Sequence, residues 1–106
     1  MTRAPRLIPV LLAFPAAAAR QDAWGRLTVL TSGGAELSTA ARLAAGERVL
    51  LSFELGGDRF EGLRARVSRA EDDADGHRLA ELSFEDPVQR RALARVLTDL
   101  LASGLP

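Results

Sequence analysis

Residues 27–38 read LTVLTSGGAELS, and this stretch decides how the chain is organised. Two short runs of alternating apolar residues flank a Thr-Ser-Gly-Gly corner. Glycine adopts positive φ without steric cost, so Gly33 and Gly34 allow one strand to end and another to begin almost at once. After the corner, apolar Ala35 and Leu37 alternate with polar residues, a period of two that is typical of a half-buried strand. The stretch therefore predicts two adjacent strands joined by a tight turn.

Further segments carry the same strand signal. The clearest is residues 48–55, in which every second side chain is apolar and after which Gly56 and Gly57 form a hairpin signal. In the next segment Gly62 predicts a bulge that bends the strand. Residues 70–77 are interpreted as a solvated hairpin tip, because they lack the last carboxylate that a calcium loop requires. With the pair around the corner, the predicted strands are residues 7–14, 26–30, 34–38, 48–55, 59–69 and 78–84.

The end of the chain predicts one amphipathic helix at residues 87–103. Asp86 can accept backbone N–H bonds as the N-cap, and Pro87 suits the first helical position. One apolar stripe at helical spacing comprises Leu93, Val96, Leu97, Leu100 and Leu101. A lone helix of this length is marginal in water, so the stripe needs a barrel, a second copy or another protein as its partner. Together the elements predict a mainly β fold, a six-stranded antiparallel β-barrel with a C-terminal amphipathic α-helix.

Composition excludes several classes of function. The 106-residue chain, enough for one domain, has fourteen basic and fourteen acidic residues, so nothing in its charge favours nucleic acid or an anionic membrane. It has no Cys and a single His, His77, so we expect no enzymatic activity, no metal site and no cofactor. All the basic residues are Arg, and Arg64, Arg66 and Arg69 form a short basic face that could recognise an acidic partner.

The N-terminal part of the chain fits two interpretations. Its basic start, apolar centre and small residues at 16–19 also describe a secretory signal peptide, which would be removed with residues 1–19. The alternative is a strand at residues 7–14, which the positions of its two prolines favour because proline is tolerated at an edge strand. The apolar run is too short for a transmembrane helix, so no membrane insertion is expected. Residues 16–25 are interpreted as a connection that places Trp24 at the barrel rim.

The corner resembles the second signature of the PilZ domain, a small bacterial signalling barrel that typically binds cyclic di-GMP. That signature, Asp/Asn-x-Ser-x-x-Gly, falls on Val29, Thr31 and Gly34, so the turn is kept and the acidic or amide residue is missing. The similarity continues in the order of the elements, from an Arg-containing N-terminus to the C-terminal helix. It implies a single domain over residues 1–106, with an N-terminal arm at 1–6, a barrel at 7–84 and a helix at 87–103.

The resemblance also implies where a ligand would bind. In the family, an Arg-x-x-x-Arg motif before the first strand wraps the dinucleotide, and the corner supplies polar contacts. Here that motif aligns on Thr2 and Arg6, whereas Arg3 and Arg6 stand one residue too close together. Val29 replaces the acceptor that would meet guanine. The candidate ligand-binding residues are therefore Arg3, Arg6, Thr31 and Gly34, and the missing contacts imply that cyclic di-GMP binding is weakened or lost.

Three functions follow from these observations. The resemblance favours a cytoplasmic protein–protein adaptor in bacterial motility or surface behaviour, acting on another protein and able to form a homo-oligomer through its helix. The second function is a cyclic di-GMP receptor that uses Arg3, Arg6 and Thr31 in an altered geometry. The third is an exported small barrel from which residues 1–19 are cleaved.

Overall fold

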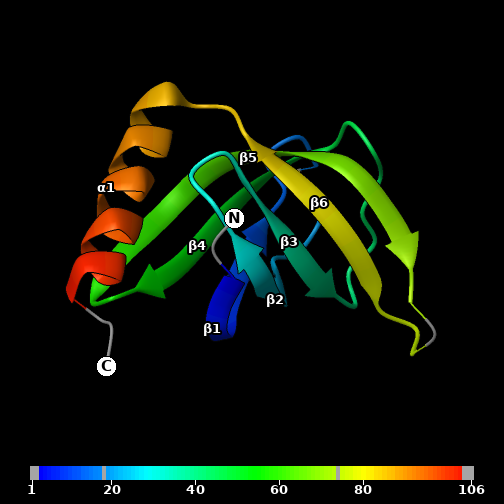
Figure 1. Cartoon of the computed structure of the whole chain (residues 1–106). Helices are drawn as coiled ribbons and strands as arrows, with labels where there is room; N and C mark the ends of the chain where they lie inside the picture. The colour runs from blue at the N-terminus through cyan, green and yellow to red at the C-terminus, as the bar shows by residue number, and fades with distance from the viewer. Residues whose placement is uncertain (1–2, 18, 74, 104–106) are drawn as a thin grey trace.

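The fold is a β-barrel with one helix beside it, as seen in a computed structural model (Figure 1). The structure describes residues 3–17, 19–73 and 75–103, with residues 3–7 and Ser103 described through their backbone alone. The elements are β1 (Arg3–Ala13), β2 (Ala23–Leu30), β3 (Gly34–Thr39), β4 (Arg48–Leu55), β5 (Asp58–Asp72), β6 (Arg78–Phe84) and α1 (Pro87–Ser103).

The strands close into a barrel in the order β1-β2-β3-β6-β5-β4, and β4 returns to β1. Every neighbouring pair is antiparallel. Strands β3 and β6 are neighbours in the barrel although they are far apart in the sequence. In their ladder, Gly34 lies opposite Ser83 at one end and Thr39 lies opposite Arg78 at the other. Over the described residues, the predicted six-stranded antiparallel barrel with a C-terminal helix is confirmed.

The first hairpin is longer than its sequence pattern predicts. The backbone of β1 begins at Arg3, which pairs with Val29, so the strand starts four residues before the predicted Leu7. β2 begins at Ala23, so the prediction of a connection through residue 25 is wrong. The missed signal is Gly25, which faces inward where an added Cβ would lie 2.8 Å from Leu37 Cδ1. A glycine that normally weakens a strand is here the residue that lets Leu37 fill the interior.

The hairpin of β4 and β5 contains the predicted bulge. The register shifts between Leu51 and Phe53, and Gly62 opposite them has a φ of 66°. The backbone N–H of Gly62 donates to the hydroxyl of Ser52 at 3.2 Å, which satisfies a group that the bulge removes from the ladder. The prediction that Gly62 marks a bulge in this strand is therefore confirmed.

The acidic hairpin tip lies between β5 and β6, and β5 continues to Asp72 before the chain turns. Asp72 forms an ion pair with Arg78 at the base of the tip, and both Asp75 and His77 are exposed. Among the described residues, no three His, Cys, Asp or Glu side chains come together in a way that could hold a metal ion.

The inward-facing side chains of all six strands fill the barrel. A six-stranded barrel is narrow enough for side chains to close it, and large aliphatic groups contribute roughly 1.5–3 kcal/mol each when fully buried. The largest fully buried apolar side chains are Leu12, Leu27, Leu30, Leu37, Leu51, Leu63, Leu93, Val10, Val49 and Val67. Leu93 is the contribution of α1, so the helix belongs to the same core as the strands.

The helix begins as predicted. The Asp86 carboxylate accepts from the N–H groups of Val88 at 2.8 Å and Gln89 at 3.3 Å, which satisfies two of the free donors of the first turn. The Gln89 amide then joins the helix to β5, donating to the Gly62 carbonyl at 3.1 Å and accepting from the Arg64 N–H at 2.8 Å. This polar bridge uses backbone groups of β5 beyond the end of its pairing with β6, which stops at Ala65 opposite Phe84.

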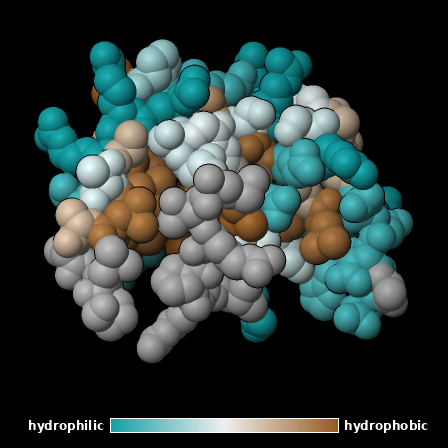
Figure 2. Space-filling view, in the orientation of Figure 1, coloured by the Kyte–Doolittle hydropathy of each residue, from teal (hydrophilic) through white to brown (hydrophobic). Residues whose placement is uncertain are grey.

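The apolar stripe of α1 is only partly covered. Leu93 is fully buried and Leu97 packs against the core, whereas Leu101 is 48% exposed. α1 stands beside the hairpin of β4 and β5 (Figure 1), and Leu100 packs on Gly56 there. Figure 2 shows apolar surface between α1 and the strands on the face turned to the viewer. Among the described residues, no helix combines the length and apolar character that crossing a membrane requires.

Candidate functional site

The corner between β2 and β3 is built around the hydroxyl of Thr31. That oxygen accepts from the backbone N–H groups of Gly33 at 3.3 Å and Gly34 at 3.1 Å, and it lies 3.2 Å from the Gly34 carbonyl. The Thr31 N–H donates to the same carbonyl at 2.9 Å. A Ser or Thr hydroxyl that bonds the backbone two and three residues ahead fixes a turn. The Thr31 side chain therefore holds the corner in shape.

Gly34 is required by a close approach of two strands. An added Cβ at Gly34 would lie 2.2 Å from the carbonyl oxygen of Leu82 on β6, and neither Gly33 nor Gly34 has positive φ. The expectation that these glycines serve a positive-φ turn is therefore wrong. The corner lies so close to β6 that the Phe84 N–H donates to the Gly33 carbonyl at 3.0 Å.

Position 29, where the family signature has an acid or amide, carries a buried apolar side chain. Val29 is 8% exposed and does not belong to the main core cluster. Its Cα partner across the ladder is Arg3, so the N-terminal segment runs directly beside the corner strand. Arg6 follows in the same strand β1. The side chains of Arg3 and Arg6 lie outside the described part of the structure.

The helix brings two further cations to the corner. A shallow hollow of about 310 Å³ is lined by Ser32, Pro87, Arg90, Arg91 and Ala94. The Arg90 guanidinium lies 3.6 Å from where a Cβ would stand on Gly33. Sequence reasoning missed both arginines, because the helical pattern predicts that they lie off the apolar stripe and does not predict which loop they face.

Ion pairs fix other arginines in structural positions. Arg20 lies 3.7 Å above the Phe14 ring, bonds Glu47 at 2.7 Å and donates to the carbonyl of Arg42, so it fastens two loops together. Arg59 bonds Glu61 at 2.7 Å. That hydrogen bond and the charge of Glu61 raise the pKa of the Arg59 guanidinium above its usual value. These arginines are engaged within the molecule.

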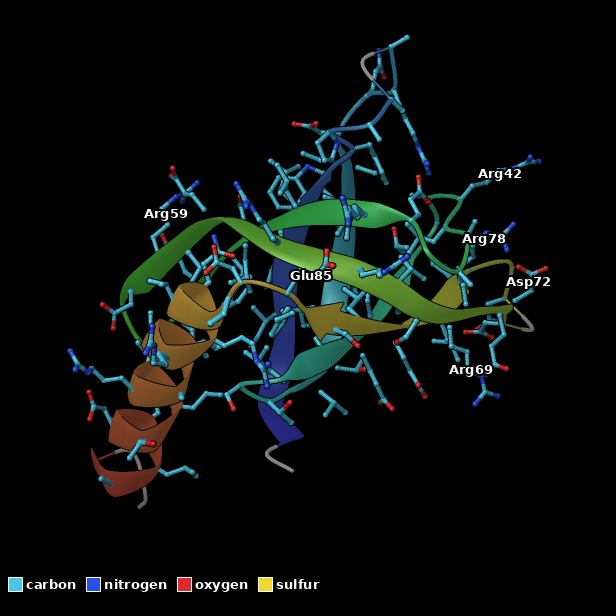
Figure 3. The ribbon with its side chains drawn as sticks, turned by 90° about the horizontal axis from the view of Figure 1, so that it is seen from above. Arg42, Arg59, Arg69, Asp72, Arg78 and Glu85 are labelled. Carbon is cyan, nitrogen blue, oxygen red and sulfur yellow. The ribbon has the colours of Figure 1, made fainter. Side chains whose placement is uncertain are left out.

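Charged residues are spread along the length of β5. Arg59 lies toward the end of the barrel where α1 stands (Figure 3). Arg69 lies at the far end, with the ion pair of Arg78 and Asp72. Glu85 lies between these two ends (Figure 3), and Arg64 and Arg66 lie in the middle of β5, so charged groups follow the whole strand.

No protein-family model matches the sequence, and no curated protein matches it closely enough to count as a relative. YcgR of Escherichia coli, solved in complex with c-di-GMP, shares the fold with a TM-score of 0.73 and 19% identity, over 97% of this chain and 45% of that one.

Two further solved structures are similar. The PilZ domain of CeSA from a cellulose-synthesizing bacterium has a TM-score of 0.65 and 26% identity, over 95% of this chain and 99% of that domain. MotI (DgrA), the inhibitor of motility of Bacillus subtilis, has a TM-score of 0.66 and 16% identity, over 95% of this chain and 50% of that one. The chain is a PilZ-like domain, and it spans about half the length of YcgR and MotI.

Proposed function

We propose that this PilZ-like domain is a bacterial signalling adaptor that acts on another protein in the cytoplasm, with cyclic di-GMP binding weakened or lost. The observation that carries the proposal is Val29, an apolar side chain that is 8% exposed where a guanine acceptor would be needed. An isopropyl group can neither accept nor donate a hydrogen bond. A dinucleotide seated at the corner would leave its own polar edge unpaired there.

The expected loss of affinity is large. The contact at Val29 is absent, and the spacing of Arg3 and Arg6 displaces one of the two charged contacts to phosphate. A hydrogen bond to a charged group contributes about 1.5–3 kcal/mol. Losing two such contacts weakens binding by roughly two to four orders of magnitude. The hydroxyl of Thr31 does not offset this loss, because it already accepts two backbone N–H groups within the corner.

The solved structures of similar fold support a regulatory role. YcgR was solved with c-di-GMP bound, and MotI is named as an inhibitor of motility. A domain of this fold that has lost ligand contacts retains a rigid barrel for recognising a protein. We therefore propose a role in motility or surface behaviour, with no enzymatic step, in agreement with a chain that has no Cys and one His.

One observation favours a second candidate, a receptor with an altered site. The pairing of Arg3 with Val29 places the N-terminal segment next to the corner, where Arg3 and Arg6 could approach the phosphates of cyclic di-GMP. In that case binding would be in the low micromolar range and would depend on both arginines.

Calorimetric titration with cyclic di-GMP separates the two candidates. The adaptor proposal expects binding weaker than about 100 µM for the natural sequence, as the loss of two charged contacts implies. It also expects a gain of at least about tenfold when Thr2→Arg and Val29→Asn restore the family pattern, with Val29→Ala as the matched control. Low-micromolar binding that Arg3→Ala/Arg6→Ala abolishes would overturn the proposal and establish the receptor.

The exported alternative has its own test. Cleavage of residues 1–19 would remove β1, which pairs with both β2 and β4, and would open the barrel. Sequencing the N-terminus of the protein isolated from its native cells should detect residues upstream of Arg20. A mature protein that starts near Arg20 would contradict a cytoplasmic adaptor.

A further inference from the structure

The outer surface around β4 differs from the rest of the barrel in its chemistry. Strand alternation turns the apolar side chains of Pro9, Leu11 and Leu50 outward, although each lies on a strand whose other face is in the core. Trp24 joins them, because it is the Cα partner of Leu11. We call this surface the β4 face, and its members are Pro9, Leu11, Pro15, Trp24, Leu50, Arg48, Arg59, Arg64 and Arg66.

Two hollows follow one another along β4. The first, of about 590 Å³, lies over residues 48–50 and is bordered by Pro15, Arg64 and Pro87. The second, of about 250 Å³, lies over residues 52–54 and is bordered by Leu11 and Trp24. Strand β4 supplies lining to both, so the two hollows lie one after the other along the same strand, and we call this line the track.

The aromatic anchor of this track is Trp24. It is the single Trp of the chain and is 68% exposed, although Trp is normally well buried. Exposed aromatic and Arg side chains around an apolar centre are the usual composition of a protein-binding hot spot. The β4 face has this composition, with Leu11 and Leu50 at its centre and arginines at its edge.

Two arginines of the β4 face have no ion pair with a described residue. Its carboxylates are already engaged: Glu54 with Arg59 at 3.6 Å, and Glu85 with Arg48 at 3.5 Å. Asp86 caps the helix. Arg64 and Arg66 are exposed, stand opposite Leu50 and Arg48 in the ladder, and form no ion pair with any described residue. Two guanidinium groups on this surface therefore lack a counter-charge.

We propose that the β4 face binds an acidic segment of a partner protein that also carries apolar side chains. The apolar groups would occupy the hollow beside Trp24, and the carboxylates would pair with Arg64 and Arg66, where bidentate geometry favours arginine. The track from Arg48 to Glu54 is roughly 20 Å long at the rise of a β-strand, which accommodates an extended segment of about seven residues. The inference rests on the proposed adaptor function and names the chemistry of its partner.

The acidic loop of a second copy fits this surface poorly. Of its carboxylates, Glu71 and Asp72 already pair with Arg69 and Arg78. The loop at residues 73–77 contains no large apolar side chain that could fill the hollow beside Trp24. A different protein is therefore the better occupant.

A random peptide library displayed against the full chain tests the proposal. Enriched peptides should combine Asp or Glu with large apolar residues. When synthesised, they should shift the emission of Trp24 to shorter wavelength and protect it from acrylamide. Arg64→Glu/Arg66→Glu should weaken their binding by about tenfold or more, as expected for charge pairs across an interface. The matched control is Arg42→Glu/Arg95→Glu, which makes the same charge change at exposed residues away from the β4 face and should leave affinity within about twofold.

Several results would overturn this inference. One is that the library yields no enriched peptide, or only basic or uncharged peptides. Another is that the enriched peptides bind the Arg64→Glu/Arg66→Glu variant as tightly as the natural chain, while circular dichroism shows that both proteins are folded. A dimer in sedimentation that Trp24→Ser dissociates would make a second copy the occupant instead. Tight cyclic di-GMP binding with intact peptide binding would contradict the adaptor proposal and leave the β4 face in place.

Discussion

The molecule contains two Gly-Gly turns, and they use glycine for opposite reasons. In the hairpin of β4 and β5, Gly56 and Gly57 have φ angles of 61° and 87°, the combination that a type I′ turn requires. In the corner of β2 and β3, neither Gly33 nor Gly34 has positive φ, and Gly34 is instead pressed against the carbonyl of Leu82. The same dipeptide thus meets a conformational requirement in one turn and a spatial requirement in the other.

The comparison shows that residues at the positions of a family signature can have purely structural roles. Gly34 sits in the signature position, yet its role in this chain is explained by the packing of β3 on β6. The hydroxyl of Thr31, also in the signature, is explained by the hydrogen bonds of the corner. Neither residue requires a ligand to account for it.

The largest expected effect is that of Gly34→Ala. A Cβ at 2.2 Å from a backbone oxygen cannot be accommodated by a side-chain rotation, so β3 and β6 must separate. We expect a loss in the free energy of unfolding of about 3 kcal/mol or more, measured by urea denaturation followed by circular dichroism.

The neighbouring Gly33→Ala is the matched control. Its Cβ would meet only the mobile end of Arg90 at 3.6 Å, an ordinary contact. It should change the free energy of unfolding by less than about 1 kcal/mol. If both substitutions lower the free energy of unfolding equally, the contact with Leu82 is not the reason for Gly34, and both glycines serve the backbone conformation of the corner.

A smaller effect is expected at Gly57. Nothing lies within 4 Å of an added Cβ there, so Gly57→Ala tests backbone conformation alone and should cost about 1–2 kcal/mol in the free energy of unfolding. Gly57→Asn should recover much of this loss, because Asn tolerates the left-handed region. If Asn and Ala cost the same, the positive φ is not the reason for this glycine.

The smallest expected effect is that of Thr31→Val. It removes an acceptor for two backbone N–H groups but keeps the shape of the side chain, so thermal unfolding should report a loss of about 1 kcal/mol. Thr31→Ser keeps the hydroxyl and should be nearly neutral. A destabilised Thr31→Ser would assign the role of Thr31 to its methyl group instead.

Most of the strands were predictable from the sequence because their signal is local. In β4, Val49, Leu51 and Phe53 alternate with outward residues, and this pattern predicts both the strand and its buried face. The start of α1 was equally local, since Asp86 and Pro87 define it within two residues.

What could not be predicted depends on residues far apart in the chain. The pairing of β3 with β6 leaves no room for a side chain at position 34. No sequence pattern near Gly34 predicts that it contacts Leu82. The bridge from Gln89 to Gly62 likewise joins a surface residue of a helix to a bulge 27 positions earlier. The candidate site residues Arg3 and Arg6 came from a spacing rule of the family, and their roles stay predictions.

The way the barrel closes has a consequence for its synthesis. β1 closes the barrel against β4 through a short seam, Leu11–Ala13 opposite Leu50–Ser52, whose partners are about forty residues apart in the chain. On the ribosome, the first strand therefore emerges well before the strand that completes its pairing, and loop closure over such a distance is slow. Until then its unpaired edge is available to chaperones or to a neighbouring nascent chain.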